Sequence, residues 1–496
     1  MPNRVHHVRR RARLSLLRAG TEGAVLERVA AAAVEPVDDP DLSAIARGGA
    51  GAAHDRSRET DAPEIAYILK AYPRASEPFI LSEVHRLEAA GLRLRLFAAK
   101  PAEANDREPR HPVIDRILAE PEYLTRAAFA GNPSIGSWLR TNWPQFAGAV
   151  RRVARRHPLG LARGLARLAA EVWHSRTGPV RRMRTAYVRE FLQAVEIVDR
   201  LADTPSVRHL HAHFAHGATT LAWFASTVAG LSFSFTGHAK DLYRVDLNPG
   251  GALRRKLVAA RFALTCTDTN RQLLEALGTH TPVYCLYHGI NADFSRLLAA
   301  SRPPSRADGP CRILAVGRLV RKKGFDVLLD AVTLLRSAGV PVDVQIIGSD
   351  GDHADELRLR VRRLGLHDVV TMRGAQDQRT LFEEYHRAHV FCLPCRVLED
   401  GDRDGIPNVL MEAMACATPV VTTDVSGIPE LVRHRENGFV VPAEDSGALA
   451  RAIFELASDE RLRARIGGAA RDTIARHFDG DRLVERLAGL FREVVR

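Results

Sequence analysis

Two acidic residues stand eight positions apart around a Gly-Ile-Pro-Asn turn in DGIPNVLMEAMACATPVV, residues 404–421. Pro407 suits the first turn of a helix, because a proline there lacks only an amide proton that would have no helical partner anyway. The amides that follow would point outward unpaired, and with the helix dipole they would bind a pyrophosphate. These predicted donors are the amides of Asn408, Val409 and Leu410.

The two acids fit the same chemistry. Glu412 lies about one turn from the predicted start of the helix, where a carboxylate can accept hydrogen bonds from both hydroxyls of a ribose. Asp404 precedes the helix and could reach the hydroxyls of a sugar. The alternative is two surface acids beside the start of a helix, and the local sequence favours neither interpretation.

The segment GRLVRKKG, residues 317–324, follows the apolar run ILAV, which is typical of a buried strand. Arg318 and Lys323 are five residues apart around a turn, so both could converge on a diphosphate. A leaving nucleoside diphosphate develops negative charge, which fixed cations stabilise without a metal ion. The residue order is not that of a Walker A loop. The alternative is an exposed basic loop, but the position after a strand favours binding.

Histidines follow two further strand-like runs. In FTGHAKDLY, His238 ends a strand and would face a cleft, and the polar Lys240 and Asp241 after it favour a site over a structural histidine. In HLHAHFAHG, residues 209, 211 and 213 are histidines on one face of a strand. The first and last of these are roughly 13 Å apart, too far for one metal ion. A metal held by neighbouring pairs stays possible, as does lining of the cleft by His213 or His216.

A fifth segment, YPRASEPFILSE, occupies residues 72–83. Ser76 and Glu77 fall in the first predicted strand-to-helix loop, where polar groups would face the cleft. Ser76 is equally suited to cap the helix that follows.

The composition is that of an ordinary globular protein, with 496 residues, 46% hydrophobic and 26% charged. Such a length predicts two or three domains. No apolar run approaches the roughly 20 residues of a membrane-spanning helix. The basic start, with RRRAR and LSLL, does not resemble a secretion signal, so we expect a cytoplasmic protein. The six cysteines lie in apolar runs, which predicts core cysteines rather than a redox or zinc site.

The net charge of +12 has a local source. Between Arg151 and Arg189 there are eleven arginines and one acidic residue, Glu171. One interpretation is a solvated surface helix, and another is a face for anionic lipid headgroups or a pyrophosphate-linked acceptor. No zinc-finger spacing, helix-turn-helix or aromatic strand motif supports nucleic acid as the partner.

Apolar strands alternate with helices along most of the chain, which predicts two parallel, doubly wound α/β sheets facing a cleft. Residues 1–62 read as a flexible extension, and the Pro-, Ser- and Gly-rich segment 301–310 marks a boundary. The predicted parts are therefore 1–62, 63–305, 306–478 and a closing amphipathic helix, 479–496.

Taken together, these motifs resemble glycosyltransferase family 4, the retaining enzymes of the GT-B fold. The resemblance extends from about Glu64 to the C-terminus and is closest to the bacterial branch that builds exopolysaccharide and colanic-acid-like units. It implies that residues 63–305 form the acceptor-side domain, 306–478 the nucleotide-sugar domain, and 479–496 a helix returning to the first domain. The segments that carry it are YPRASEPFI, HAHFAHG, FTGHAKDLY, VGRLVRKKGFDVLLDA, DGIPNVLMEAMACATPVV and SGIPELV.

The resemblance also implies roles. Arg318 and Lys323 would bind the donor diphosphate with the helix amides, Glu412 the ribose, and His238 the donor sugar. Asp404 is the first motif acid, where the family usually has glutamate, and its shorter side chain bears on the contact with the donor sugar.

The implied reaction moves a hexose from a UDP- or GDP-sugar, with retention, to a polyprenyl-pyrophosphate-linked or saccharide acceptor. It needs no cofactor or metal, and the enzyme would lie in the cytoplasm, with peripheral contact to the inner membrane face through the arginine-rich stretch. The rivals are a nucleotide-sugar epimerase of the same fold and a non-catalytic sugar- or nucleotide-binding relative.

Overall fold

The computed structural model describes residues 63–103, 110–127, 134–176, 185–300 and 309–496. The predicted extension, residues 1–62, and part of the arginine-rich stretch, 177–184, lie outside these ranges. Among the described residues, no helix combines the length and apolar character needed to cross a bilayer.

The first half is built on a seven-stranded sheet in which every neighbouring pair is parallel. The strands run apolar and buried, as sheets covered on both faces require. In spatial order they are β3 (Pro121–Tyr123), β2 (Arg93–Ala98), β1 (Glu64–Leu69), β4 (Val207–His213), β5 (Ser232–Gly237), β6 (Phe262–Thr265) and β7 (Val283–Cys285).

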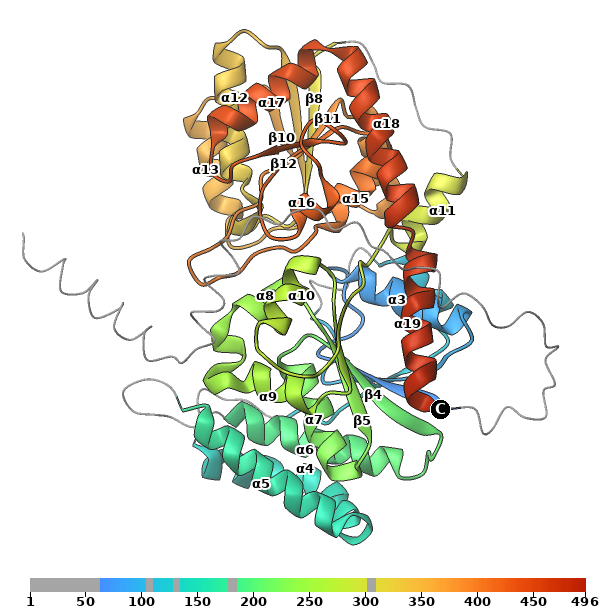
Figure 1. Ribbon diagram of the computed structural model, residues 1–496. Helices are drawn as coiled ribbons and strands as arrows, with labels where there is room; N and C mark the ends of the chain where they lie inside the picture. Colours follow the sequence, from blue (N-terminus) through green and yellow to red (C-terminus); the bar gives the residue numbers. More distant parts are fainter. Residues whose placement is uncertain (1–62, 104–109, 128–133, 177–184, 301–308) are drawn as a thin grey trace, which may run out of the picture.

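Helices cover both faces of this sheet (Figure 1). The helices of this half are α3 (Pro78–Ala89), α4 (Ile135–Arg156), α5 (Pro158–His174), α6 (Thr185–Leu201), α7 (Gly217–Ala229), α8 (Ala239–Tyr243), α9 (Ala252–Ala259) and α10 (Asp268–Glu275). The helix that follows, α11 (Ala292–Ala300), contacts α3 and, in the second half, α14. The arginine-rich stretch thus contributes the helical hairpin α4–α5, which packs on α6 and α7.

The second half repeats the plan with a six-stranded parallel sheet. Its strands, in spatial order, are β10 (Val370–Met372), β9 (Val342–Ile347), β8 (Cys311–Val316), β11 (Val390–Leu393), β12 (Val420–Thr423) and β13 (Phe439–Val441). Its helices are α12 (Phe325–Ser337), α13 (Ala354–Arg363), α14 (Gln378–Arg387), α15 (Asn408–Ala415), α16 (Ile428–Leu431), α17 (Ser446–Ser458) and α18 (Glu460–His477). The expected pair of doubly wound parallel sheets is confirmed.

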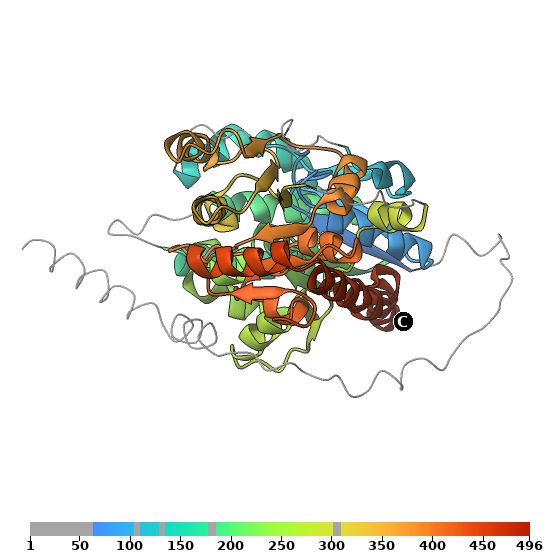
Figure 2. The same ribbon diagram turned by 90° about the horizontal axis from the view of Figure 1, so that it is seen from above.

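The last helix, α19 (Gly480–Val495), joins the two halves. It leaves α18 and lies along the first sheet, beside α3 (Figures 1 and 2). Its residues Val484, Leu487, Ala488 and Phe491 are buried in the core on that face of the sheet. The apolar residues of α19 recur every three or four positions because they form one stripe, and this stripe is the side of the helix that packs on the sheet.

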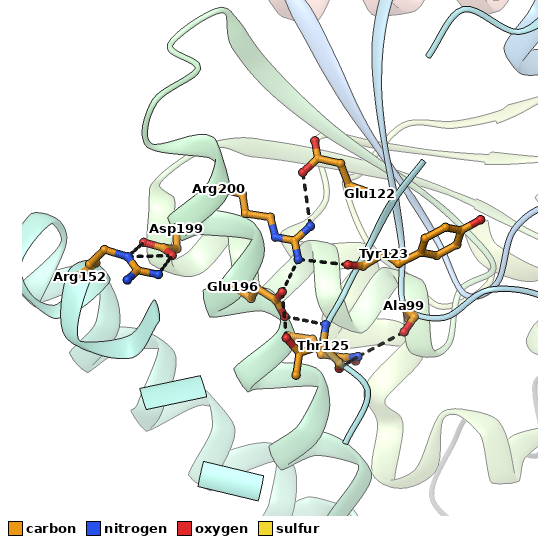
Figure 3. Close-up of polar contacts among 9 residues, drawn as sticks. Ala99, Glu122, Tyr123, Thr125, Arg152, Glu196, Asp199 and Arg200 are labelled. Carbon is orange, nitrogen blue, oxygen red and sulfur yellow. Dashed lines mark hydrogen bonds and ion pairs between the residues drawn. The ribbon is translucent and has the colours of Figure 1, made fainter. Parts of the chain in front are cut away.

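Two short strands, β3 and β13, are not among the strands expected from the sequence. Polar contacts hold the chain just beyond β3 in place (Figure 3). Glu196 on α6 accepts bonds from the amide and the hydroxyl of Thr125, at 3.0 and 3.1 Å. Nearby, Arg152 on α4 makes a two-pronged ion pair with Asp199 on α6.

The six cysteines are free thiols. Five are buried, and only Cys285 is partly exposed. Both cysteines of FCLPC are fully buried, Cys392 inside β11 and Cys395 just after it. The prediction of core cysteines is confirmed for these five.

Candidate functional site

A cleft of about 1470 Å³ lies between the two halves. Its walls come from the loops that follow β1, β4, β5 and β6 in the first sheet and β8, β9, β10 and β11 in the second. These are the carboxyl ends of parallel strands, where doubly wound folds bind ligands. The cleft brings together most of the residues singled out from the sequence.

The helix after the Gly-Ile-Pro-Asn turn starts one residue later than predicted. Pro407 has an extended conformation, with φ −64° and ψ 127°, so it is the cap of α15 and not its first turn. The amide of Leu410 donates to the carbonyl of Pro407 at 3.0 Å, and Leu410 is fully buried. The prediction that this amide points free into the site is wrong, because the first turn closes with a tight bond.

Asn408 and Val409 keep the predicted arrangement. Both line the cleft, and within the described ranges neither amide has a hydrogen-bond partner. Two free amides at the positive end of a helix dipole suit an anionic group.

Glu412 lines the same cleft, although its side chain is only 4% exposed. Its Oε1 accepts from Asn291 Nδ2 at 3.0 Å and from Gln378 Nε2 at 3.3 Å, and its Oε2 accepts from the Tyr385 hydroxyl at 2.9 Å. Burial raises the pKa of Glu412, and these three donors offset part of that rise. The carboxylate is therefore fixed in one orientation at the rear of the cleft.

Asp404 is engaged by two lysines. Its Oδ1 lies 3.1 Å from Lys322 Nζ, and its Oδ2 lies 2.7 Å from Lys323 Nζ. Lys322 also pairs with Asp402 at 3.1 Å. Sequence reasoning chose Lys323 and passed over Lys322, although the run RKK gave both residues the same signal. Each carboxylate oxygen of Asp404 is thus paired with a lysine ammonium group in the free protein.

This cluster predicts an acid-dependent stability. Burial would raise the pKa of Asp404, but Lys323 and Lys322 lower it well below its ordinary value near 3.8. A depressed carboxyl pKa stabilises the fold above the unfolded pKa, and this contribution is lost as the pH falls through the folded value. We expect Asp404→Asn to cost about 3–5 kcal/mol at pH 7, and progressively less below about pH 4. Thermal unfolding of both forms from pH 7 to about pH 2 measures this. A difference that does not shrink in acid would contradict it.

Arg318 follows β8 and lines the cleft with an exposed side chain. Its guanidinium makes no ion pair with any residue in the described ranges. Lys323, by contrast, is only 14% exposed. Of the two predicted cations in the loop after β8, Lys323 is thus paired with Asp404 and Arg318 is exposed to solvent.

His238 follows β5 and lines the cleft, as expected. Asp241 lies in the cleft wall, but its carboxylate bonds to the backbone amides of Ala215 and His238. Burial raises its pKa to about 7, although those amides act against the shift. Asp241 therefore orders the loop that carries His238.

The histidines of β4 divide into two groups. His209 and His211 bond to Ser232, Ser234 and Thr236 of the neighbouring strand segment. His213 is fully buried one layer behind the cleft wall, so its predicted place in the lining is wrong. His216 does line the cleft, bonded to Lys70 at 3.2 Å, and burial lowers its pKa to about 3.

In the part of the chain that the structure describes, two groups of side chains lie close enough to hold a metal ion: His238, Cys266 and His288, and Glu83, His211 and His213. In the second group, the imidazole nitrogens already bond to neighbouring side chains. The first group belongs to the cleft wall.

Ser76 and Glu77 both line the cleft at the start of α3. Glu77, and not Ser76, occupies the cap position, and it pairs with Arg74. Six residues further on, Glu83 reaches His213 at 2.9 Å. The sequence segment contained Glu83 but gave no sign of this contact, since its partner lies 130 residues away.

Contacts across the cleft join the two halves. Glu430, within SGIPELV, accepts bonds from the amides of Asp268 and Thr269 at 2.7 and 2.9 Å, and from the Tyr287 hydroxyl at 3.0 Å. On the other side, the Arg403 guanidinium stacks 4.0 Å above the Tyr243 ring. These contacts join the first half of the chain to the second beside the cleft.

Two nucleotide-binding-type α/β units facing a cleft define the GT-B fold, and solved structures agree. HepE from Anabaena, solved with UDP and glucose, superposes with a TM-score of 0.58 at 16% identity, over 87% of this chain and 100% of that one. At this identity the similarity establishes the fold alone.

Sequence comparisons give the family. Residues 300–473 match the model for glycosyl transferases group 1. A phosphatidyl-myo-inositol mannosyltransferase of Mycobacterium leprae is 31% identical over 278 residues, covering 55% of this chain and 69% of that protein. The chain therefore belongs to the group 1 glycosyl transferases.

Two further relatives are named for the biosynthesis of amylovoran and of colanic acid. The amylovoran biosynthesis glycosyltransferase AmsK of Erwinia amylovora is 35% identical over 37% of this chain and 45% of its own length. The putative colanic acid biosynthesis glycosyltransferase WcaL of Escherichia coli is 37% identical over 41% of this chain and 50% of its own length. The match to this chain spans about half the length of each of these two relatives.

Proposed function

We propose that this chain transfers a hexose from a UDP- or GDP-sugar, with retention, to a lipid-linked or saccharide acceptor in surface polysaccharide synthesis. One observation carries the proposal. The free amides that begin α15, the cations Arg318 and Lys323, and the carboxylate of Glu412 all face the cleft that His238 also lines. A diphosphate needs the amides and the cations, a ribose needs the carboxylate, and a donor sugar needs a polar contact such as His238.

The residues would divide the work as follows. Asn408 and Val409 would donate their amides to the diphosphate while Lys323 and Arg318 neutralise it as it leaves. Glu412 would accept the ribose hydroxyls, and His238 would contact the donor sugar. The acceptor would attack from the face the diphosphate leaves, and a phosphate oxygen would take its proton. Closure of the two halves around the donor would exclude water from the sugar cation that develops.

The names of relatives support the proposed acceptor class. AmsK and WcaL are named for the biosynthesis of amylovoran and colanic acid, and the Mycobacterium leprae relative for a phosphatidylinositol acceptor. Both kinds of name are compatible with an acceptor carried on a lipid.

The test is release of nucleoside diphosphate from a panel of UDP- and GDP-sugars, with and without a bacterial lipid extract. Release from one donor, with the label recovered in lipid or saccharide, would support transfer. Conversion of the donor to an isomeric nucleotide sugar without acceptor would favour an epimerase. Binding without turnover of any donor would favour a non-catalytic relative.

A second proposal concerns the hairpin α4–α5, which we infer contacts an anionic membrane surface. Helix α5 exposes Leu159, Leu165 and Trp173, with exposed fractions of 77%, 50% and 61%. Arg151, Arg155 and Arg163 are exposed on the same hairpin. An apolar stripe flanked by arginines suits the interface of anionic lipids.

The hairpin lies at the end of the first half that is farthest from the second half (Figure 1). A lipid bound there would not reach the cleft directly. The hairpin would hold the protein at the membrane and would not itself present the acceptor, which departs from the expectation drawn from the arginine count.

Vesicle sedimentation tests this contact. Reversing Arg151, Arg155 and Arg163 to glutamate should reduce binding to vesicles containing phosphatidylglycerol by at least about tenfold, since each basic residue near such a surface contributes about 1 kcal/mol. Reversal of the exposed Arg461, Arg471 and Arg482 in the second half and closing helix is the matched control. Equal binding by both triple variants would refute the membrane contact.

A further inference from the structure

A chain of buried polar side chains lies behind His238. Glu83 on α3 reaches His213 at the end of β4, with 2.9 Å between Oε1 and Nε2. The other nitrogen of His213, Nδ1, lies 3.2 Å from Nε2 of His238. His213 is fully buried, while His238 lines the cleft. The chain therefore connects a carboxylate inside the first half to a side chain at the cleft wall.

The ring of His238 is held on its faces as well. Phe79, Phe214 and His288 pack around it, with centroid separations of 5.2, 4.6 and 5.3 Å. With Nε2 directed at His213, the ring has one remaining nitrogen, Nδ1. The Cys266 thiol lies 4.0 Å from Nδ1, and the backbone amide of Asp241 donates to the His238 side chain in the cap of α8. A thiol is a weak donor, and an amide, like a hydroxyl, donates only to a ring nitrogen without a proton.

The proton positions follow from the carboxylate. An ionised carboxylate only accepts hydrogen bonds, so the Nε2 of His213 must carry a proton toward Glu83. The Tyr67 hydroxyl donates to the same oxygen. With a single proton on the ring of His213, the other nitrogen, Nδ1, is an acceptor, and the hydrogen bond between the two rings then requires His238 to donate from Nε2. A neutral His238 that donates from Nε2 has its lone pair on Nδ1, and its ring lines the cleft.

The charge states support this order. Burial alone would raise the pKa of Glu83, but the hydrogen bonds from His213 and Tyr67 help to lower it below the ordinary value, so the carboxylate is ionised. Burial lowers the pKa of His238 well below its ordinary value, and the surrounding imidazoles of His288 and His213 act in the same direction. His238 is therefore neutral near pH 8.

We propose that Glu83 and His213 are positioning residues, which fix the tautomer of His238 so that its Nδ1 accepts a hydrogen bond from a hydroxyl of the bound sugar. The identity of that donor rests on the proposed function. The tautomer itself does not, because it is a property of the free protein. Sequence reasoning included His238 and His213 as separate candidates and did not connect them.

The first test is the imidazole spectrum of the full chain labelled with ¹⁵N-histidine, at pH 8 and without any nucleotide. His238→Gln identifies the resonances of His238 by difference. We expect its Nε2 to be protonated and its Nδ1 to have the shift of an unprotonated nitrogen. A proton on Nδ1 would overturn the proposal, since it would mean that His213 donates to His238.

Variants of Glu83 give the second test. In Glu83→Met the carboxylate is gone, so the Tyr67 hydroxyl would donate to Nε2 of His213 and reverse both bonds, moving the His238 proton to Nδ1. Glu83→Gln keeps an acceptor oxygen and should largely retain the original tautomer. The matched control is Glu196→Met, which removes another buried carboxylate of the first half (Figure 3) and should leave the His238 tautomer unchanged. If Glu83→Met also leaves it unchanged, Glu83 does not set the tautomer.

Kinetics connect the tautomer to the sugar. Calorimetry with UDP and GDP alone should give the same Kd for wild type and Glu83→Met, because His238 would not touch the nucleotide. Turnover of the donor sugar should fall by about 10- to 100-fold, the effect measured when the partner behind a metal-ligating histidine is removed, and Glu83→Gln should recover most of it. Equal losses in Glu83→Met and Glu83→Gln would reject the positioning role. If no nucleotide binds to wild type, the proposed function fails while the spectrum still decides the tautomer.

Discussion

Replacing Glu412 by glutamine is expected to lower kcat/KM for the nucleotide-sugar donor by about 100-fold. Two hydrogen bonds from ribose hydroxyls to a charged acceptor weaken when that acceptor becomes neutral, and bonds to charged groups are worth about 1.5–3 kcal/mol each. A total loss near 2.7 kcal/mol corresponds to that factor. Release of nucleoside diphosphate from the donor identified in the panel measures the change.

The partners of Glu412 make this substitution interpretable. Tyr385 donates to Oε2 at 2.9 Å, and the glutamine retains an oxygen that can accept this bond. The alanine variant would instead leave Asn291 and Tyr385 with buried polar groups and no acceptor, which would lower stability as well.

Glu384→Gln is the matched control for Glu412→Gln. Glu384 is equally buried in the second half, is bonded to Arg312 and Arg373, and is absent from the cleft wall. Its loss should reduce the unfolding temperature without changing kcat/KM of the folded fraction. Full activity of Glu412→Gln, or an equal loss in Glu384→Gln, would contradict a role for Glu412 in holding the donor.

Replacing Lys323 by methionine is expected to weaken binding of UDP or GDP by about 10- to 100-fold at low salt, since one charge-assisted bond to a phosphate would be lost. In the free protein Lys323 pairs with Asp404, so the diphosphate must compete with that carboxylate for the ammonium group. The loss should become smaller as the salt concentration rises, because salt screens the attraction that remains in the wild type. Calorimetry at two salt concentrations measures both effects.

Two neighbouring residues provide the comparison for Lys323. Arg321 lies on the same short helical turn, pairs with Glu356 and does not line the cleft, so Arg321→Met should bind nucleotide normally. Lys322 pairs with both Asp402 and Asp404, and Lys322→Met should chiefly lower the unfolding temperature. If Arg321→Met loses as much affinity as Lys323→Met, the effect comes from the charge of the loop as a whole.

Several features of the site could be predicted from short segments. The run ILAV followed by GRLVRKKG placed Arg318 and Lys323 after a strand, because buried parallel strands read as apolar runs and their loops meet at one edge of the sheet. The glycine and proline of the turn before Asn408 predicted the start of a helix. The prediction of a free amide at Leu410 in the same segment was wrong, since the sequence does not reveal whether the first turn of a helix closes with a tight hydrogen bond.

Other features have no local trace. The donors that fix Glu412 come from Asn291, Gln378 and Tyr385, which are 121, 34 and 27 residues away. The partner of Glu83 is 130 residues distant. Such pairs leave no period or motif, because a long-range polar contact constrains two positions and nothing between them.

The sequence by itself determined the two doubly wound sheets, the helix beginning near Asn408 and the basic loop after β8. Each of these depends on backbone bonding and apolar periodicity over a few neighbouring residues. Only the tertiary structure decided that Asp404 is held by two lysines, that His213 stands behind the cleft wall, and that Glu83 lies at the end of the chain leading to His238. These arrangements depend on how helices pack onto separate strands, and a buried charge takes its properties from whichever groups that packing brings within hydrogen-bond distance.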